Sequence, residues 1–396
     1  MNSLRSHEIV IIDGARTAFA KFGGPFKNLS AIELGAITAQ EAIKRANVDA
    51  AEIDHVVYGN VIQSSPDAVL MARHVGLKAG IPKEVPALTV NRLCGSGLES
   101  ITQAARMIMT GESQIALAGG AENMSQIPHV IRGARWGIPL FEAPMQDYLY
   151  EALYDPVGKV YMAETGENLA VQYGLTREEI DQHALSSHQK ALAAMEAGRL
   201  GDEIVPIEVR EGKQTIVVDR DQHPRETSLE KLAKLEPKFK ADGVVTAGNA
   251  SGINDGAASV IVTSAAYAAK RGLKPIARLV SWAVAGVDPT IMGIGPCPAI
   301  QKALKQANLS LQDMDLIEIN EAFSAQYLAC QRQLDFDPSI GNVNGGAVAL
   351  GHPLGASGTR ISLSLLYELG RRGKKYGASS LCIGGGQGIA AIWERL

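Results

Sequence analysis

The sequence predicts an α/β protein made of two similar halves, with a long segment inserted in the first half. Three observations carry this prediction: strand-like and helix-like runs alternate, a segment of the first half recurs in the second, and one central stretch has no counterpart. Alternating strands and helices are typical of a mainly parallel sheet covered on both faces. We therefore expect two pseudo-symmetric βαβαβαββ halves in a layered α/β sandwich, with helices between the sheets.

The repeat is visible in three pairs of segments. The run AIKRANVDAAEIDHVVYGN begins at Ala42 and ALKQANLSLQDMDLIEINE begins at Ala303, a shift of 261 residues without a gap. The same shift places CGSG, residues 94–97, on GASG, residues 355–358, and with a small gap IALAGGAEN matches SLCIGGGQG. Three matches in one order indicate two copies of one αβ unit.

The repeat also suggests where the chain divides. We expect a first half over residues 1–119, an inserted loop domain over 120–247, a return segment over 248–274 and a second half over 275–396. Long insertions between structural elements are often where ligand contacts lie. The inserted domain is therefore expected to cover a site that the two halves build.

Composition excludes several classes of protein. The chain has 396 residues, 46% hydrophobic and 20% charged, which is enough to bury a core, and its net charge of -4 gives no argument for nucleic-acid binding. None of the four cysteines lies in a CxxC pair, and no HExxH or Walker motif is present, so we expect no metal. The start lacks the apolar core of a signal peptide, and no run approaches the about 18 apolar residues of a membrane span. We expect a reducing, aqueous compartment.

Cys94 is the first candidate for chemistry. It lies in NRLCGSG, between the strand-like VPALTV and a helix-like run. A helix N-terminus offers free N–H groups and a positive dipole end, which favour a thiolate and lower its pKa. The alternative is a small buried cysteine that fills a tight turn. The local pattern leaves both interpretations open.

His352 is the second candidate, in the Gly/Pro-rich turn GHPLGASG that matches the Cys94 loop by repeat. Pseudo-symmetric loops should meet near the axis that relates the halves, which brings His352 within reach of Cys94. A neutral histidine beside a cysteine can take its proton. The alternative is a structural histidine in a turn.

Two further polar positions end apolar strands. Cys382 precedes the glycines of CIGGGQG and is either a site residue or an inert core thiol. Asn320, in INEAF, could hold a water or a carbonyl group, or it could cap a helix. The small-residue loop TAGNASGINDGAA, residues 246–258, could let a ligand lie close to the backbone or be a plain connection.

Taken together, NRLCGSG, NEAFSA, GHPLGASG and CIGGGQG, in this order, resemble the signature motifs of the thiolases. The resemblance covers essentially the whole chain, from DGARTAFAKFGG to the last strand, and is strongest to the degradative 3-ketoacyl-CoA thiolases. It implies the thiolase fold. It also implies an acyltransferase that cleaves 3-ketoacyl-CoA with CoA, reversibly and with ping-pong kinetics, with CoA as substrate and no cofactor.

The resemblance implies a role for each motif residue. Cys94 would carry the acyl group as a thioester, His352 would take its proton, and Cys382 would act as acid and base at the α-carbon of acetyl-CoA. One oxyanion hole would be formed by His352 and a water on Asn320, and the other by the N–H groups of Cys94 and Gly384.

The resemblance also places residues against the substrate. Those expected to contact CoA or the acyl group are Ser251, Ala247, Met162, Met292, Ala322, Phe323 and Arg225. Two positions depart from the family pattern: Tyr161 stands where short-chain biosynthetic thiolases carry a histidine, and Pro224 and Arg225 occur in reversed order.

Alternatives to this reading are an acetyl-CoA acetyltransferase specific for acetoacetyl-CoA and a non-catalytic CoA-binding or lipid-binding relative. An acyl-carrier-protein synthase is disfavoured, since Cys382 stands where that class typically has histidine or asparagine. The expected partners are acyl-CoA and CoA, with no nucleic acid and no membrane. A homodimer or homotetramer is expected, in the cytoplasm or, in a eukaryote, the mitochondrial matrix.

Overall fold

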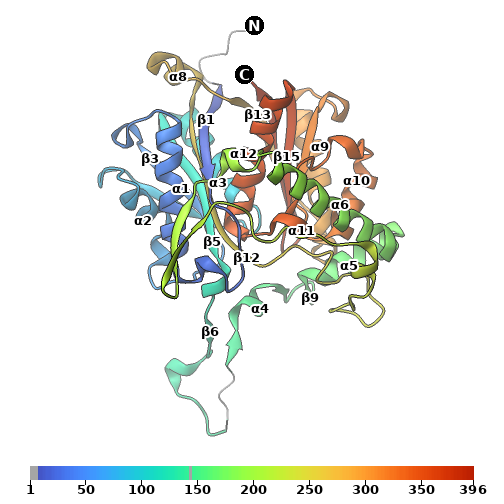
Figure 1. The fold of residues 1–396 in the computed structure, drawn as a ribbon. Coiled ribbons are helices and arrows are strands. Elements are labelled where there is room, and N and C mark those ends of the chain that lie inside the picture. Colours follow the sequence, from blue (N-terminus) through green and yellow to red (C-terminus); the bar gives the residue numbers. More distant parts are fainter. Residues whose placement is uncertain (1–7, 142–144) are drawn as a thin grey trace.

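The computed structural model describes residues 8–141 and 145–396 (Figure 1), so residues 1–7 of the N-terminal segment considered above lie outside it. The main elements of the first half are β1 (Ile9–Arg16), β2 (Ala20–Lys21), α1 (Ala31–Arg45), β3 (His55–Gly59), α2 (Met71–Lys78), β4 (Ala87–Val90), α3 (Ser96–Thr110), β5 (Ile115–Asn123), β12 (Asn254–Ser264) and α8 (Ala265–Arg271). Those of the second half are β13 (Ala277–Gly286), η7 (Pro289–Ile294), α9 (Pro296–Ala307), β14 (Leu316–Ile319), α10 (Ser324–Leu334), α11 (Ala347–Leu350), α12 (Leu354–Arg372), β15 (Tyr376–Ile383) and β16 (Gln387–Arg395).

The two halves repeat one order of elements. A strand and a helix (β1 and α1, or β13 and α9) lead to a short parallel strand (β3 or β14), a second helix (α2 or α10), a central helix (α3 or α12) and two final strands. The repeated sequence segment runs from the end of α1 into β3 in the first half and from the end of α9 into β14 in the second. The halves lie side by side, with α3 and α12 between them (Figure 1).

The sheet is mixed, so the expectation of a mainly parallel sheet was wrong. β3 pairs in parallel with β4 and β5, and β14 with β15, but β12 runs antiparallel to both β5 and β1, and β16 antiparallel to β15 and β13. The reason is that the last strand of each half folds back on its neighbour. Gly385 and Gly386, at φ values of 76° and 82°, make the tight turn from β15 to β16, and a hairpin can join only antiparallel strands.

The halves join along β1 and β13. Residues 9–11 of β1 pair with residues 277–279 of β13, which makes one continuous ten-stranded sheet. In the central layer, Leu98 of α3 and Ile361 of α12 belong to one buried apolar cluster with strand residues of both halves. The predicted helical layer is thus confirmed, although it packs between the two halves of one continuous sheet and not between separate sheets.

The central helices touch through glycines. A Cβ atom on Gly97 would lie 2.7 Å from the carbonyl oxygen of Gly355, and one on Gly358 would collide with the main chain of Leu98. Only glycine permits this close approach of two backbones. The loops that precede α3 and α12, and that carry Cys94 and His352, are therefore brought to one place.

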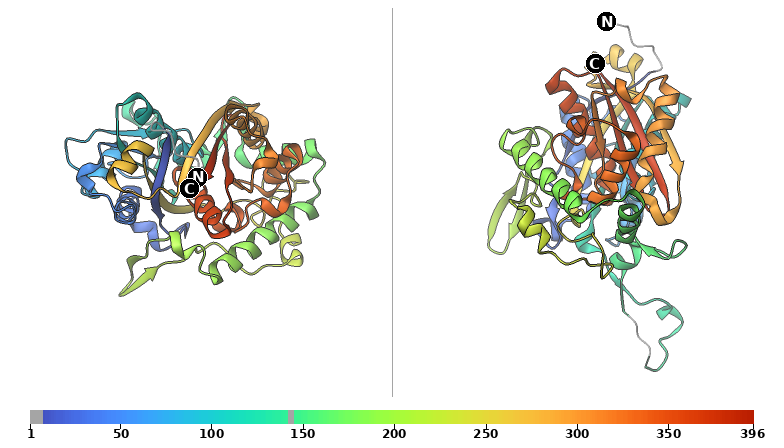
Figure 2. Two further views of the ribbon diagram at one scale, coloured as in Figure 1. Left: turned by 90° about the horizontal axis from the view of Figure 1, so that it is seen from above. Right: turned by 90° about the vertical axis from the view of Figure 1, so that its right-hand side faces the viewer.

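Between β5 and β12 the chain leaves the sheet. This excursion contains β6 (His129–Val130), β7 (Gln146–Asp147), α4 (Tyr148–Ala152), β8 (Tyr154–Asp155), β9 (Val160–Tyr161), α5 (Met162–Tyr173), α6 (Arg177–Glu196), β10 (Ile207–Glu211), β11 (Gln214–Val218) and α7 (Leu229–Ala233). An arm around β6 and α4 projects from the body (Figure 1), and the helix α6 lies along the second half (Figure 2). In the part of the chain that the structure describes, no helix has the length and apolar character to span a membrane.

Candidate active site

Cys94 lies in a tight turn between β4 and α3. Leu93 has a φ of 45°, in the left-handed region that a leucine rarely adopts. The Oγ atom of Ser96 closes the turn, since it accepts from the Arg92 N–H at 2.9 Å and donates to the Leu93 carbonyl at 2.6 Å. The turn holds the half-buried Cys94 directly ahead of the first turn of α3.

The Cys94 thiol is neutral in the free protein. Burial raises its pKa to about 11, against the N–H groups of Gly384 and of Cys94 itself, which act to lower it, while the charge of Glu122 raises it further. The expectation of a lowered pKa was therefore wrong, because burial outweighs the helix N-terminus. A base must remove the proton before this sulfur can act as a nucleophile.

Gly384 follows β15 and brings its N–H to the Cys94 sulfur. A Cβ atom at this position would lie 3.1 Å from the Met162 Sδ atom and 3.3 Å from Leu93, so a larger residue would displace its neighbours. Two backbone N–H groups thus converge beside one sulfur. Such a pair can stabilise a negative oxygen on a carbon bound to that sulfur.

His352 is held between two polar partners. Its Nδ1 atom lies 2.6 Å from Ser357 Oγ and its Nε2 atom 3.3 Å from Asn320 Nδ2. Because Ser357 Oγ donates its own proton to the Pro353 carbonyl at 2.8 Å, it accepts from Nδ1–H. Nε2 then carries the lone pair. Burial, and after it the charge of Arg360, lower the pKa of His352 to about 3, so the ring is a neutral proton acceptor.

Ser357 was missed as a site residue, although it lies within the quoted motif GHPLGASG. The repeat, which sets Ser357 on Ser96, and its position five residues after His352 are the sequence signals that could have singled it out.

Asn320 directly follows β14, and its main-chain N–H donates to the Ser380 carbonyl at 2.9 Å. Its side-chain Nδ2 faces His352, and its Oδ1 atom is buried without a hydrogen-bond partner among the described residues. Buried polar atoms of this kind are ordinarily satisfied by water or a ligand. Asn320 is therefore placed to hold a small polar group next to the imidazole.

Cys382 lies fully buried in β15. Burial raises its pKa well above the usual value, and the nearby Cys94 and Cys330 add to the increase. Its apolar surroundings are residues that the resemblance places against the substrate: Met292, Ala322, Met162 and Phe323. The effect of Cys94 on this pKa places the two thiols close together, with Cys382 inside this cluster and Cys94 against a separate one around Ile62 and Leu354.

The residues assigned to CoA fall into two groups. The Ser251 N–H donates to the Ala322 carbonyl at 2.9 Å, which places the exposed loop of Ala247 beside the acyl pocket. Arg225 is exposed and its Nη1 atom lies 3.2 Å from His223 Nε2. No ion pair among the described residues engages Arg225, so its charge is open to an anionic ligand.

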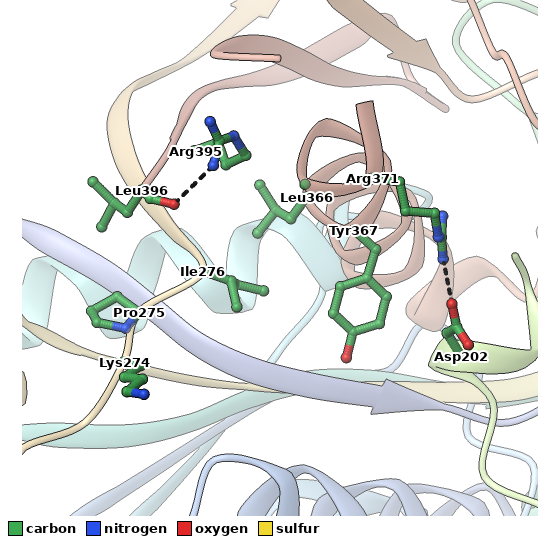
Figure 3. A pocket seen from close by; sticks show the side chains of 10 residues that line it. Asp202, Lys274, Pro275, Ile276, Leu366, Tyr367, Arg371, Arg395 and Leu396 are labelled. Carbon is green, nitrogen blue, oxygen red and sulfur yellow. Dashed lines mark hydrogen bonds and ion pairs between the residues drawn. The ribbon is translucent and has the colours of Figure 1, made fainter. Parts of the chain in front are cut away.

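A hollow elsewhere on the molecule contains none of these residues. It has a volume of about 510 Å³ and lies between the end of α12, the loop before β13 and the C-terminus (Figure 3). Arg371 on its rim already pairs with Asp202 at 3.3 Å. Across residues 8–141 and 145–396, no group of His, Cys, Asp and Glu side chains is arranged to hold a metal ion.

Two neutral thiols and a proton-accepting imidazole, carried by loops that meet where the two repeated α/β halves join, are suited to acyl transfer through a cysteine. The comparisons with known proteins agree. The family model for the thiolase N-terminal domain matches residues 9–266, and that for the C-terminal domain matches residues 273–395. The chain belongs to the thiolase family, as the motifs predicted.

Similarity to individual thiolases extends over nearly the full chain. The mitochondrial 3-ketoacyl-CoA thiolase of Homo sapiens is 52% identical over 387 residues, 97% of each chain. The acetyl-CoA acetyltransferase of Pseudomonas aeruginosa is 48% identical over 391 residues, 98% of this chain and 99% of that one. The crystal structure of the human mitochondrial enzyme in complex with CoA superposes with a TM-score of 0.95, at 50% identity and with 100% of both chains covered. The predicted thiolase fold is confirmed.

Proposed function

We propose that the protein catalyses the thiolytic cleavage of 3-ketoacyl-CoA by CoA, giving acetyl-CoA and a shortened acyl-CoA, and the reverse condensation. The full-length similarity to 3-ketoacyl-CoA thiolases supports this activity. The observation that carries it is the neutral His352, whose Nε2 lone pair is available to take a proton in a site shared by two thiols.

In the first step Cys94 attacks the ketone carbonyl of the substrate while His352 Nε2 takes the thiol proton. The bond between the ketone carbon and the α-carbon then breaks. Its electron pair goes to the acetyl-CoA enolate, which Cys382 protonates. The acyl group remains on Cys94 as a thioester.

In the second step the thiol of CoA gives its proton to the Cys382 thiolate and attacks the thioester. Cys94 leaves as a thiolate and recovers its proton from His352. The CoA thiol proton replaces the one that Cys382 gave to acetyl-CoA, and every side chain regains its starting protonation state, so the cycle uses CoA as a substrate and requires no cofactor.

Two developing negative oxygens need stabilisation. The N–H groups of Cys94 and Gly384 serve the oxyanion on the carbon attached to Cys94. The enolate oxygen is served by the protonated Nε2 of His352 and by a water held on Asn320. Oxyanion donors of this kind contribute about 3 kcal/mol each.

Substrate binding follows the two groups of residues described above. The pantetheine arm of CoA runs past Ser251 and Ala247 to the sulfur, and Arg225 meets a phosphate at the nucleotide end. Met162, Met292, Ala322 and Phe323 line the acyl pocket. The loop domain, residues 120–247, covers the site.

Specificity for acetoacetyl-CoA alone is the second candidate, since acetyl-CoA acetyltransferases are among the relatives. Tyr161 argues against it. Its ring centroid lies 4.4 Å from that of Tyr150 and 4.9 Å from that of Tyr154. The three tyrosines form an aromatic group, and Tyr161 directly precedes the pocket residue Met162 in the sequence. We assign the enzyme to longer 3-ketoacyl chains.

A second copy of this chain is the proposed macromolecular partner, in a dimer or tetramer. The projecting arm exposes large apolar side chains, with Trp136 at 88% and Phe141 at 98% exposure, and the edge strand β4 exposes Leu88. Apolar surface of this kind marks interfaces. The expected compartment is the cytoplasm or, in a eukaryote, the mitochondrial matrix. Light scattering tests the assembly, and a monomer would contradict it.

The activity is tested by incubating the protein with a medium-chain 3-ketoacyl-CoA, with and without CoA. With CoA, mass spectrometry should detect acetyl-CoA and the shortened acyl-CoA. Without CoA, the Cys94 peptide should gain the mass of the acyl group. A protein that binds CoA but forms neither product would be the non-catalytic relative instead.

A further inference from the structure

Glu122 is a buried carboxylate that the mechanism above does not use. It lies one residue before the end of β5, with 0% of its surface exposed. Fully buried carboxylates are rare unless they are well paired. Burial raises the pKa of Glu122 to about 7, against three backbone N–H donors that lower it. Such an environment calls for an explanation.

The hydrogen bonds of Glu122 connect the two halves of the molecule. Three donors come from the loop after β3: Val61 N–H to Oε2, Ile62 N–H to Oε1 and Asn60 Nδ2 to Oε1, each at 3.0 Å. The fourth donor, 2.9 Å from Oε2, is the N–H of Gly355 in the second half. All four groups donate, so the arrangement suits the ionised carboxylate.

The contact with Gly355 replaces a missing helix cap. The first N–H groups of a helix have no partner within the helix, and Pro353, the N-cap residue of α12, makes no side-chain hydrogen bond to them. Glu122 supplies the acceptor and a negative charge at the positive end of α12. A Cβ atom on Gly355 would lie 3.0 Å from Glu122 Oε2, so the glycine leaves room for the carboxylate.

The same contacts reach both reacting side chains. His352 immediately precedes Pro353, the cap of α12, and its partner Ser357 lies in the first turns of that helix. On the other side, Cys94 packs on an apolar cluster that contains Ile62 and Leu354. Ile62 is itself a donor to Glu122, and Leu354 directly precedes the donor Gly355. Glu122 therefore joins the surroundings of Cys94 to the start of the helix that follows His352.

We propose that Glu122 is a positioning residue for the thiolase reaction, which fixes His352 relative to Cys94 by tying the loop after β3 to the N-terminus of α12. The inference rests on the proposed function. A protonated Glu122 would turn one of its acceptor oxygens into a donor facing an N–H group. One of the four hydrogen bonds would then be lost, and the two halves would be less firmly joined.

The charged surroundings of Glu122 are few. Asp255, on the neighbouring strand β12, is a second buried carboxylate, and burial raises its pKa to about 6. Its partners are the N–H and hydroxyl of Ser125, at 2.9 and 2.6 Å, so it does not bridge to the second half. Among the described residues of the turn before α3, Cys94 and Arg92 are ionisable, and Arg92 pairs with Glu99 at 2.8 Å; His352 stands before α12. Asp255 is therefore the matched control.

The test compares kcat, KM for CoA and the pH profile of kcat in the wild type, Glu122→Gln and Asp255→Asn. Glu122→Gln should lower kcat about tenfold or more, with KM for CoA changed less than about twofold. The kcat of the wild type should fall as the pH drops below about 7, because Glu122 becomes protonated there. We call this fall the acid limb, and Glu122→Gln, which is neutral at every pH, should lack it. Asp255→Asn should keep most of kcat and keep the limb, moved to lower pH because the charge of Asp255 raises the pKa of Glu122.

A second variant guards against a Glu122→Gln protein that does not fold. Asn60→Ala removes one donor and keeps the carboxylate. Because a donor favours the charged form, its loss raises the pKa of Glu122 and should move the acid limb to higher pH. An inactive wild type would overturn the proposed function itself. With an active wild type, two results would contradict the positioning role. The first is a folded Glu122→Gln protein that keeps the kcat and the acid limb of the wild type, and the second is an Asn60→Ala protein whose acid limb does not move.

Discussion

The Nδ1 atom of His352 lies 2.6 Å from the Oγ atom of Ser357, and this contact decides which imidazole nitrogen carries the proton. Replacing Ser357 by alanine leaves Nδ1 without its acceptor, and the ring can turn or change tautomer. We expect kcat of Ser357→Ala to fall about tenfold, the effect of roughly 1.4 kcal/mol, with KM for CoA unchanged.

Ser362 provides the control for this variant. It is a buried serine of the same helix, and its hydroxyl donates to the Gly358 carbonyl at 2.9 Å. Ser362→Ala should lower the melting temperature as much as Ser357→Ala does, without the loss of kcat. Equal losses of kcat in both variants would mean that Ser357 acts only through stability.

Cys94→Ser should abolish thiolysis and acyl-enzyme formation together. A serine hydroxyl is a much weaker nucleophile, and the partners of His352 among the described residues are Ser357 and Asn320, neither of which is acidic and could strengthen it as a base. We expect kcat below about 10⁻³ of wild type, measured by acetyl-CoA release, and no acyl mass on the active-site peptide. A variant that still acquired this mass would assign the nucleophile elsewhere.

Cys382→Ser should separate the two half-reactions. Cys94 and His352 remain, so an acyl-CoA should still acylate Cys94, whereas condensation of acetyl-CoA should be lost for want of a group to remove the α-proton. Mass spectrometry follows the first and acetoacetyl-CoA formation the second. Cys330→Ser, at another buried cysteine, should retain both. Normal condensation by Cys382→Ser would remove its assigned role.

Alkylation of Cys94 in the free enzyme should increase steadily with pH. Because burial raises the pKa of Cys94 to about 11, the reactive thiolate is a minor form at neutral pH, and its fraction rises about tenfold per pH unit below that pKa. The pKa of His352, near 3, adds no step between pH 5 and 9. Inactivation by iodoacetamide measures this, and a plateau near pH 6 would indicate a resting thiolate–imidazolium pair.

Tyr161 should favour longer acyl chains. We expect kcat/KM for a medium-chain 3-ketoacyl-CoA to equal or exceed that for acetoacetyl-CoA, and Tyr161→His to shift the ratio toward acetoacetyl-CoA. Val171→Ala, at an exposed position of α5, is the control and should leave the ratio unchanged. A sharp preference of the wild type for acetoacetyl-CoA would contradict this assignment.

The repeat and the four motifs were sufficient to predict the fold, the family and the meeting of the Cys94 and His352 loops. They could not predict quantities that depend on solvent exclusion. A helix N-terminus suggested a lowered pKa for the Cys94 thiol, but burial raises that pKa and is the larger effect. They could not predict that β12 and β16 fold back antiparallel, since a strand-like run carries no direction. Glu122 escaped notice because its donors lie about 60 and 230 positions away.

The glycine contact between α3 and α12 limits how this enzyme can be altered. Since Gly97 meets Gly355, and Gly358 meets Leu98, backbone to backbone, any side chain added at these glycines would force the two helices apart. The inserted segment, by contrast, packs on this frame from outside. Acyl specificity can therefore change by exchange of the segment around Tyr161, while the frame of the two catalytic loops stays constant.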